Sequence, residues 1–287
     1  MKKIIVLMST FNDGTELDHS ISSILQQTYS NFDFVIVDDH STNGTYEKLL
    51  SYSKKDRRIV LIRNDENIGF SKSLNKGILS SSSDFIARMD ADDVSDPERL
   101  EREVSFLESH PQYSMCGSDY CCFDENGVWG LCRAKSNPTF RDVVLSCPFC
   151  HPSVMVRRTA ILDSGLYTCW PKKTRMSEDY DLWCKMYQKG YKGANISIPL
   201  LFYREGEEAY KKRKFIFQLH LLGLKKKWRK AFSLPAFKDI LFIKDLLVGI
   251  LPRWLYSRLH RKNLRKELIR AKKKGEVDVS RINVFLQ

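Results

Sequence analysis

Short apolar runs alternate with amphipathic segments over the first ninety residues of the chain. The runs cover residues 4–8, 34–37, 59–62 and 85–87, and each has the length of a β-strand. Between them, apolar residues recur at helical spacing, as at Leu17, Ile21 and Ile24. Strands that are apolar on both faces and alternate with helices are typical of a parallel sheet covered on both sides. The pattern therefore predicts an α/β fold.

Polar residues follow each of these four runs. They are Ser9, Thr10, Phe11 and Asn12 after the first run, Asp38 and Asp39 after the second, residues 64–69 after the third, and Asp90, Asp92 and Asp93 after the fourth. In open α/β sheets, ligands bind beyond the carboxyl ends of the parallel strands. We therefore expect one edge of the sheet to gather hydroxyl, amide and carboxylate groups.

Later segments carry weaker signals. Asp96 is a good N-cap for a helix with Pro97 at its first position. A mixed strand region is expected over residues 113–133 and a further strand over 153–156. Ser177 is expected to cap a helix that runs towards Gly190, with acidic residues in its first turn.

The charge divides the chain into two predicted parts. Residues 209–287 hold 22 Lys and Arg against 5 Asp and Glu, whereas residues 1–208 hold 25 against 30. We expect an α/β domain over 1–208 and a basic amphipathic helical extension over 209–287 whose partner is anionic.

The extension is expected to lie on a membrane without crossing it. Residues 237–251 are apolar but interrupted by charges, and so fall short of the ~20 apolar residues of a spanning helix. Cations mixed with Trp254 and Tyr256 follow, a pattern typical of helices at an anionic membrane surface. A merely solvated basic tail is the alternative. Nucleic acid is not expected as a partner, because no recognition motif accompanies the charge.

Eight cysteines lie in the middle of the chain, and no signal-peptide pattern precedes them. The sequence therefore predicts free thiols in a cytoplasmic protein. Cys147 and Cys150 have the spacing of a redox or zinc pair, but no second pair accompanies them, so buried thiols are favoured over a metal site.

Four carboxylates fall within seven residues, at Asp90, Asp92, Asp93 and Asp96. A hard divalent cation, Mg²⁺ or Mn²⁺, relieves their mutual repulsion and completes its coordination with phosphates and water. An acidic turn in solvent would have the same composition. The position of the cluster after a buried strand favours the metal site.

Five motifs together resemble a known family. They are Ser9-Thr10-Phe11-Asn12, Val37-Asp38-Asp39-His40-Ser41-Thr42, Asn67-Ile68-Gly69, Met89-Asp90-Ala91-Asp92-Asp93 and Ser177-Glu178-Asp179. Their order and spacing over residues 3–204 resemble the inverting family 2 glycosyltransferases, which have the GT-A fold. The resemblance implies an enzyme that moves a sugar from a nucleotide-diphosphate donor, with a divalent metal, in cell-surface polysaccharide or lipopolysaccharide biosynthesis.

The resemblance also implies roles for single residues. Asp39 would accept a hydrogen bond from the nucleobase, expected to be uracil, with Phe11 against the ring and Ser9 and Thr10 lining the pocket. Asn67 belongs to the same donor site. Asp90 would contact the ribose, and Asp92 would hold the Mn²⁺ or Mg²⁺ ion that bridges the diphosphate.

Asp179 is the expected catalytic base, because it matches the second member of the family's Glu-Asp pair. Without the other motifs, the acids from Glu178 to Asp181 would simply favour the start of a helix. Two departures stand out: His40 replaces the usual Gly, and the His that often follows Arg204 is missing. His151 receives no role.

Features of the processive members are missing too. The chain has neither their Gln-x-x-Arg-Trp motif nor several membrane helices, so one sugar per visit is expected. A basic tail then suits a glycan or lipid-linked acceptor at the inner face of the cell membrane. Two alternatives remain open: a nucleotidyltransferase, and a peripheral membrane or nucleic-acid binding protein with an inactive domain of this fold.

Overall fold

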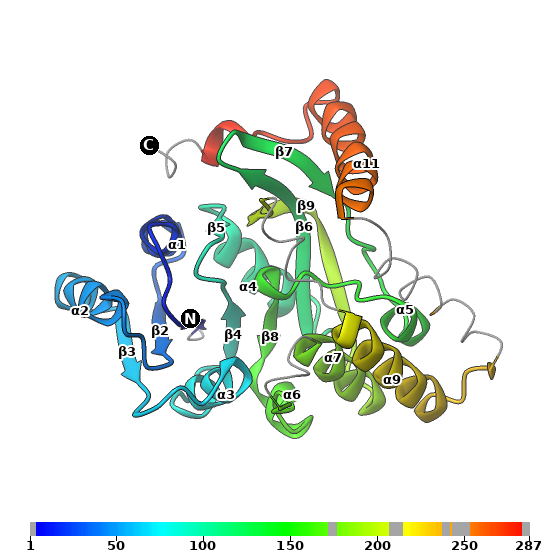
Figure 1. The fold of residues 1–287 in the computed structure, drawn as a ribbon, viewed down its shortest axis with the longest axis horizontal. Helices are drawn as coiled ribbons and strands as arrows, with labels where there is room; N and C mark the ends of the chain where they lie inside the picture. The colour runs from blue at the N-terminus through cyan, green and yellow to red at the C-terminus, as the bar shows by residue number, and fades with distance from the viewer. Residues whose placement is uncertain (1–3, 172–176, 207–214, 237–241, 243–252, 283–287) are drawn as a thin grey trace.

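One mixed β-sheet forms the centre of the molecule (Figure 1). The computed structural model describes residues 4–171, 177–206, 215–236, 242 and 253–282. Its strands are β1 (Ile4–Thr10), β2 (Phe32–Asp38), β3 (Ile59–Arg63), β4 (Phe85–Arg88), β5 (Val94–Ser95), β6 (Met115–Asp124), β7 (Gly127–Cys132), β8 (Met155–Arg157) and β9 (Gly193–Arg204). Along the sheet their order is β3-β2-β1-β4-β8-β6-β9-β5, with β7 paired to β6.

The first half of the sheet is parallel, as the apolar runs predict. β1 pairs in parallel with β2 and β4, and β2 pairs in parallel with β3. Thr10 lies beside Asp38 and Leu7 beside Arg88 in this register, so the carboxyl ends of β1, β2 and β4 meet at one edge. The α/β class is therefore confirmed, and the polar residues that follow these strands share one side of the sheet.

Helices cover both faces of the sheet. They are α1 (Glu16–Leu25), α2 (Thr45–Lys55), α3 (Phe70–Leu79), α4 (Arg99–Ser109), α5 (Phe140–Leu145), α6 (Arg158–Asp163), α7 (Glu178–Gln188), α9 (Phe215–Ala231) and α11 (Arg253–Lys273). Short 3₁₀ turns lie at His151–Ser153 and Ser280–Ile282.

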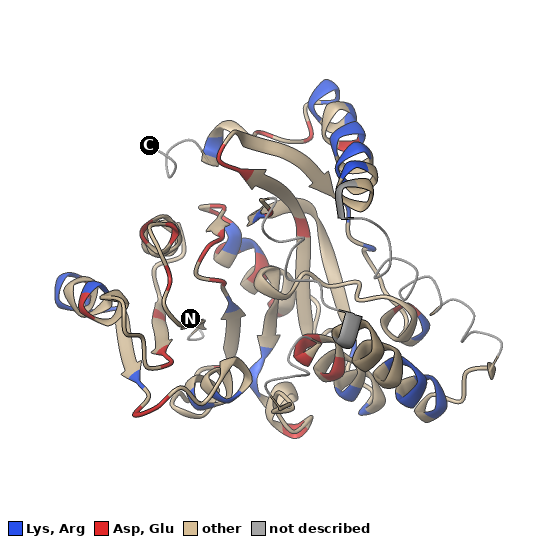
Figure 2. Cartoon of the chain, viewed as in Figure 1, with Lys and Arg blue, Asp and Glu red and all other residues tan. Residues whose placement is uncertain are grey.

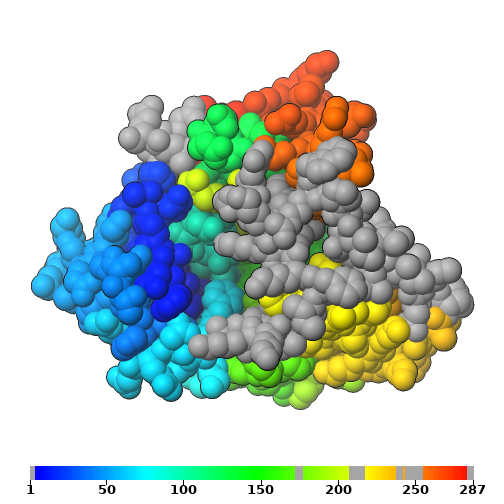
Figure 3. Space-filling view, in the orientation of Figure 1, coloured from blue at the N-terminus to red at the C-terminus, as the bar shows by residue number. Residues whose placement is uncertain are grey.

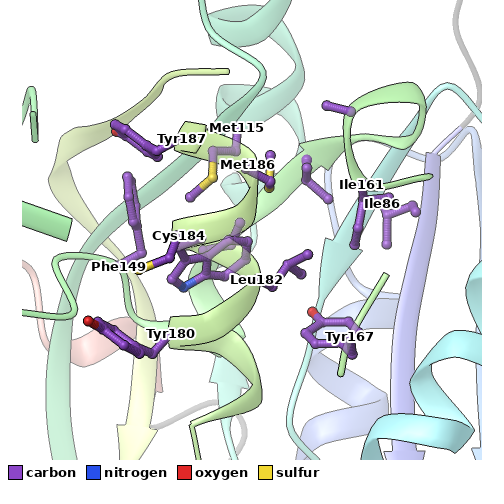
Figure 4. Close-up of a cluster of buried hydrophobic side chains, with 14 of the residues drawn as sticks. Ile86, Met115, Phe149, Ile161, Tyr167, Tyr180, Leu182, Cys184, Met186 and Tyr187 are labelled. Carbon is purple, nitrogen blue, oxygen red and sulfur yellow. The ribbon is translucent and has the colours of Figure 1, made fainter. Parts of the chain in front are cut away.

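Alternate residues of each strand face opposite apolar layers. Ile4, Val6 and Met8 of β1 pack with α1 and α4 on one face. Ile5 and Leu7 belong to the other layer, which contains residues of α3 and α7. Figure 4 shows the α7 part of this second layer, where Leu182, Cys184 and other residues of α7 lie among side chains of the strands. Burying each large aliphatic side chain of this kind is worth about 1.5–3 kcal/mol.

Two element boundaries differ from those expected. α4 begins at Arg99, because the Asp96 carboxylate accepts a hydrogen bond from the Glu98 backbone N–H (3.0 Å) and closes a turn before the helix. Strand β8 begins at Met155, since the 3₁₀ turn occupies the preceding residues. Helix α7 begins directly after Ser177 as expected, but the serine side chain makes no capping hydrogen bond.

The two described helices of the C-terminal region pack against the sheet domain. α9 lies against α5 and α7, and α11 lies against β7 (Figure 1). In the space-filling view the orange α11 sits next to the green strand region (Figure 3). Arg261 of α11 pairs with Asp124 at 2.9 Å, and Arg281 pairs with Asp96 at 3.1 Å.

Two sequence predictions for this region fall on residues that the structure does not describe. They are the domain boundary at 208 and, apart from Phe242, the interrupted apolar segment 237–251. Within the described residues, no helix combines the length and the apolar character that crossing a bilayer requires.

Candidate active site

The acidic loop after β4 brings three carboxylates together. Asp90, Asp92 and Asp93 each offer an oxygen, and these oxygens lie within 4.8 Å of one another. The Arg88 guanidinium pairs with Asp90 at 2.5 Å, and the Ser20 hydroxyl of α1 donates to the Asp90 carbonyl (2.8 Å). The loop is thus held from the strand before it and from α1.

Asp93 is the residue of this loop for which sequence reasoning assigned no role. Its side chain is fully buried, and Oδ1 accepts a hydrogen bond from the Arg204 N–H at 2.8 Å. Oδ2 is buried without a hydrogen-bond partner among the described residues. Burial, Asp92 and Asp90 together raise the pKa of Asp93 well above its ordinary value. A buried carboxylate oxygen facing two other carboxylates fits a hard divalent cation, which would supply the missing partner.

A buried ion pair fixes the strand end beneath this loop. Arg99 and Glu103 of α4 are both fully buried, with Nε and Oε1 3.0 Å apart. Arg99 Nη2 also donates to the backbone carbonyl of Arg88 at 2.8 Å. Helix α4 therefore holds the last residue of β4 two positions before Asp90.

Asp39 is a buried carboxylate directly beyond β2. Its carboxylate accepts hydrogen bonds from Asn64 Nδ2 (2.9 Å), the Ile68 N–H (2.9 Å) and the Gly69 N–H (2.8 Å). Asn67 Nδ2 donates to the Asp39 carbonyl at 3.2 Å. An ionised carboxylate has about four acceptor positions, so these three bonds leave room for one further donor.

The backbone beside Asp39 adopts the conformation that glycine favours. His40 has φ of 66°, and its ring Nδ1 lies 3.2 Å from the Asn64 carbonyl oxygen. A non-glycine residue rarely takes a positive φ, and His is among the residues in which it is less uncommon. The loop therefore keeps its shape although His40 replaces glycine.

The loop after β1 completes this side of the site. The Thr10 hydroxyl donates to the Asp13 carboxylate, and Ser9 and Thr10 are both buried. The Phe11 ring is 47% exposed, so an apolar face is open to a ligand. Burial raises the pKa of Asp13, and Asp90 adds to that rise, which shows that the loops after β1 and β4 are neighbours.

Asp179 belongs to the second acidic group, in the first turn of α7. Its Oδ1 accepts the Tyr180 N–H at 2.7 Å, and the Cys147 thiol lies 3.7 Å from Oδ2. Burial raises the pKa of Asp179, although the Tyr180 and Cys147 hydrogen bonds and the positive charge of Arg88 oppose that rise. Burial and the negative charge of Asp179 raise the pKa of Glu178 in the same way.

Arg88 connects the two acidic groups. Besides its pair with Asp90, it lowers the pKa of Asp93, Glu178 and Asp179 against the effect of their burial. Its guanidinium lies 5.1 Å from the Phe70 ring centroid. The acids after β4 and those of α7 are therefore within electrostatic reach of the same cation. Sequence reasoning missed Arg88, because within the apolar run of β4 it carries no motif.

A buried histidine and tyrosine lie beside this cation. His151 Nε2 is 2.7 Å from the Tyr167 hydroxyl. Burial and the nearby Arg88 lower the pKa of His151 well below its ordinary value, so the ring is neutral at pH 7. Burial also raises the pKa of Tyr167, and Asp179, Glu178 and Asp90 add to the rise. Tyr167 thus lies within electrostatic reach of both acidic groups.

Among the described residues, Cys147 and Cys150 do not belong to a group of three or more side chains that could hold a metal ion. All eight cysteines are free thiols, and the described residues contain one group able to hold a metal ion, the three aspartates after β4. Cys147 is exposed next to Asp179 and Cys150 is half-buried, so the expectation of buried thiols is wrong for Cys147.

A family model for glycosyl transferase family 2 matches residues 5–165, which include the loops after β1, β2 and β4. The chain belongs to this family. EpsE of Bacillus subtilis, named as a glycosyltransferase, is 35% identical over 263 residues, which are 91% of this chain and 94% of EpsE.

Two further relatives of this family 2 glycosyltransferase have names that describe the polysaccharide or the reaction that they serve. The amylovoran biosynthesis glycosyltransferase AmsE of Erwinia amylovora is 29% identical over 213 residues (73% of this chain, 79% of AmsE). WfgD of Escherichia coli, a UDP-Glc:α-D-GlcNAc-diphosphoundecaprenol β-1,3-glucosyltransferase, is 28% identical over 212 residues (73% of this chain, 80% of WfgD).

Solved structures show the same fold. S. aureus TarS in complex with UDP-GlcNAc has a TM-score of 0.61 and 16% identity, and the match covers 96% of this chain and 92% of that one. The mannosyltransferase PcManGT of Pyrobaculum calidifontis, in complex with GDP-Man and Mn²⁺, has a TM-score of 0.62 and 18% identity over 98% of this chain and 78% of its own. The expected GT-A fold is confirmed.

The comparisons decide between the classes that the sequence left open. This family 2 protein is a glycosyltransferase and not a nucleotidyltransferase.

Proposed function

We propose that the enzyme moves one sugar from a UDP-sugar to an acceptor hydroxyl with inversion, using a divalent cation and Asp179 as the base. One observation carries the proposal: Arg88 pairs with Asp90 and also lowers the pKa of Asp179, so both acidic groups are within electrostatic reach of the same guanidinium. A donor bound at the acids after β4 would therefore present its sugar to α7.

The donor nucleoside is assigned to the pocket formed by the loops after β1 and β2. Asp39 has one acceptor position left for a base N–H, and the exposed ring of Phe11 offers a stacking face. Ser9, Thr10 and Asn67 are assigned to the same side of the donor site, and Asp90 is assigned to the ribose. Uracil is favoured because the TarS complex contains UDP-GlcNAc, although PcManGT binds GDP-Man.

The metal is assigned to Asp92, with Asp93 and Asp90 in reach. The three oxygens within 4.8 Å and the unpartnered Oδ2 of Asp93 fit Mn²⁺ or Mg²⁺. Such a cation would stabilise negative charge on the departing nucleoside diphosphate. Arg204 keeps Asp93 in place through the backbone hydrogen bond at 2.8 Å.

Asp179 is assigned the role of the base that accepts the proton of the acceptor hydroxyl. A general base works best when its pKa approaches the working pH, and burial moves the pKa of Asp179 in that direction. Its position at the first turn of α7 opposes this, because the positive end of the helix dipole favours the carboxylate. Burial and the start of the helix therefore shift the pKa of Asp179 in opposite directions.

The acceptor is proposed to be presented at an anionic membrane surface on the cytoplasmic side. The outward face of α11 carries exposed Arg258, Lys262 and Lys266 together with exposed Leu259 and Ile269 (Figure 2). Cations interspersed with apolar side chains on one helix face suit the headgroup region of a bilayer. The name of WfgD, which acts on a diphosphoundecaprenol-linked sugar, supports a lipid-linked acceptor.

The substitution Asp179→Asn tests the proposal. Loss of a general base should lower kcat by at least ~100-fold while the donor KM changes little. Glu178→Gln is the matched comparison on the same turn, and should retain most of the turnover. Initial rates of transfer with a panel of UDP-sugars and Mn²⁺ measure both variants. Full turnover by Asp179→Asn would remove the residue from this role.

A further inference from the structure

Asp181 is a buried carboxylate on α7 that the proposed reaction does not use. Its side chain is 1% exposed. It accepts hydrogen bonds from the Thr168 hydroxyl (2.6 Å) and the Trp228 indole Nε1–H (2.9 Å). The ammonium groups of Lys227 and Lys185 lie 3.5 Å and 3.9 Å away. A buried carboxylate is costly unless it is paired in this way, so these contacts fix where Asp181 lies.

Two of the four contacts come from the C-terminal region. Trp228 and Lys227 belong to α9, which also packs its buried Leu224 into the apolar layer that contains α7. The Trp228 side chain is only 3% exposed, and the Lys227 ammonium lies 4.5 Å from its ring centroid. Helix α9 therefore docks on α7 through a polar contact inside an apolar interface.

Asp181 and Asp179 lie on opposite sides of the same helical turn. An α-helix turns by about 100° per residue, so side chains two positions apart point about 200° from each other. A contact that holds Asp181 against α9 therefore also fixes the rotation of the first turn of α7, and with it the direction of Asp179. Figure 4 shows this helix packed on its inner side by large side chains.

We propose that Trp228 and Asp181 form a positioning contact, through which α9 of the C-terminal region sets the orientation of the Asp179 carboxylate towards the acceptor. The inference rests on the proposed role of Asp179 as the base. Neither residue touches substrate; both act through the first turn of α7.

Trp228→Phe tests the contact with little change in packing. It removes the indole N–H and keeps an aromatic ring in the interface. Misplacement of a catalytic group by a fraction of an ångström to 1 Å costs up to about 100-fold, so a loss of about tenfold in kcat is expected, with the donor KM within about twofold. Amide hydrogen exchange of residues 177–188, measured without substrate, should become faster at the start of α7.

Trp129→Phe is the matched control. It makes the same chemical change on β7, at an indole N–H that has no hydrogen-bond partner among the described residues. Neither kcat nor exchange in α7 should change. Asp181→Asn, which keeps the shape of the side chain but removes its charge, should lower kcat in the same direction as Trp228→Phe.

The outcomes separate the inference from the proposed function. Equal rates of sugar transfer in wild type and Asp179→Asn would refute the role of Asp179 as the base. Amide hydrogen exchange at the start of α7 would still test whether Trp228 and Asp181 hold this turn. If Asp179→Asn is inactive but Trp228→Phe keeps full kcat, the positioning role is refuted, even if Trp228→Phe lowers the Tm. A fall in kcat together with faster exchange in α7 supports it.

Discussion

Replacement of Glu103 by Gln should change how the stability of the enzyme depends on pH. Glu103 is fully buried and paired with Arg99 at 3.0 Å. Burial raises the pKa of Glu103 from its ordinary 4.5 to about 7, although Arg99 opposes the rise. Its Oε2 has no hydrogen-bond partner among the described residues, which agrees with the cost of ionising this carboxyl in the interior.

The sign and size of the effect follow from the two protonation states. The folded protein binds the Glu103 proton more tightly than the unfolded chain, so the group stabilises the fold below pH 4.5 and this contribution is lost as the pH rises to 7. The pKa difference is about 2.5, and at about 1.4 kcal/mol per pKa unit the full effect amounts to about 3.5 kcal/mol, of which about 3 kcal/mol falls between pH 4.5 and 8. Gln resembles the protonated acid at every pH, so the variant does not lose this stability as the pH rises.

The measurement is the free energy of unfolding by urea at several pH values between about 4.5 and 8. Taking Glu103→Gln minus wild type at each pH cancels the other titrating groups. This difference should move by about 3 kcal/mol in favour of Gln as the pH rises. Glu101→Gln, on the exposed side of α4, controls for the loss of one carboxylate from this helix. A difference constant to about 0.5 kcal/mol over the range would show that Glu103 is ionised throughout.

Two further predictions concern the metal and the membrane. Asp92→Ala should abolish the Mn²⁺-dependent part of UDP binding in calorimetry, because the cation loses a ligand; unchanged heats with and without Mn²⁺ would contradict the site. Lys262→Glu combined with Lys266→Glu should weaken binding to anionic liposomes by about tenfold or more, at about 1 kcal/mol per cation near the surface. The same reversal at Lys54 and Lys55 of α2 is the control, and equal losses in both variants would contradict a docking face on α11.

The centre of the fold could be predicted because its signal is local. Residues 4–8 and 34–37 are apolar on both faces, which only a covered parallel strand explains, and both are strands in the structure. Boundaries were less certain because distant partners set them. The start of α4 depends on a turn closed by Asp96, whose carboxylate is also held by Arg281, 185 residues further along the chain.

The candidate site was predicted in part for the same reason. Asp39, Asp90, Asp92 and Asp179 carry recognisable motifs, and in the structure the first three follow strands β2 and β4 while Asp179 lies in the first turn of α7. Arg88 carries no motif. Its importance comes from its electrostatic effect on acids that are about ninety residues apart in the sequence, which only the fold brings within reach of one cation.

The C-terminal region shows how net charge can hide a second role. Composition averages over all faces of a helix, so the exposed cations of α11 dominate its charge, whereas Leu268 and Ala271 on the opposite face are buried against the sheet. The same holds for α9, where exposed Lys226 and Lys230 flank the buried Trp228 that binds Asp181. A truncation at residue 208 would therefore remove the partner of α7 together with the basic surface. Loss of activity in such a variant could not be assigned to the membrane, and surface charge reversals separate the two effects because they leave the buried face intact.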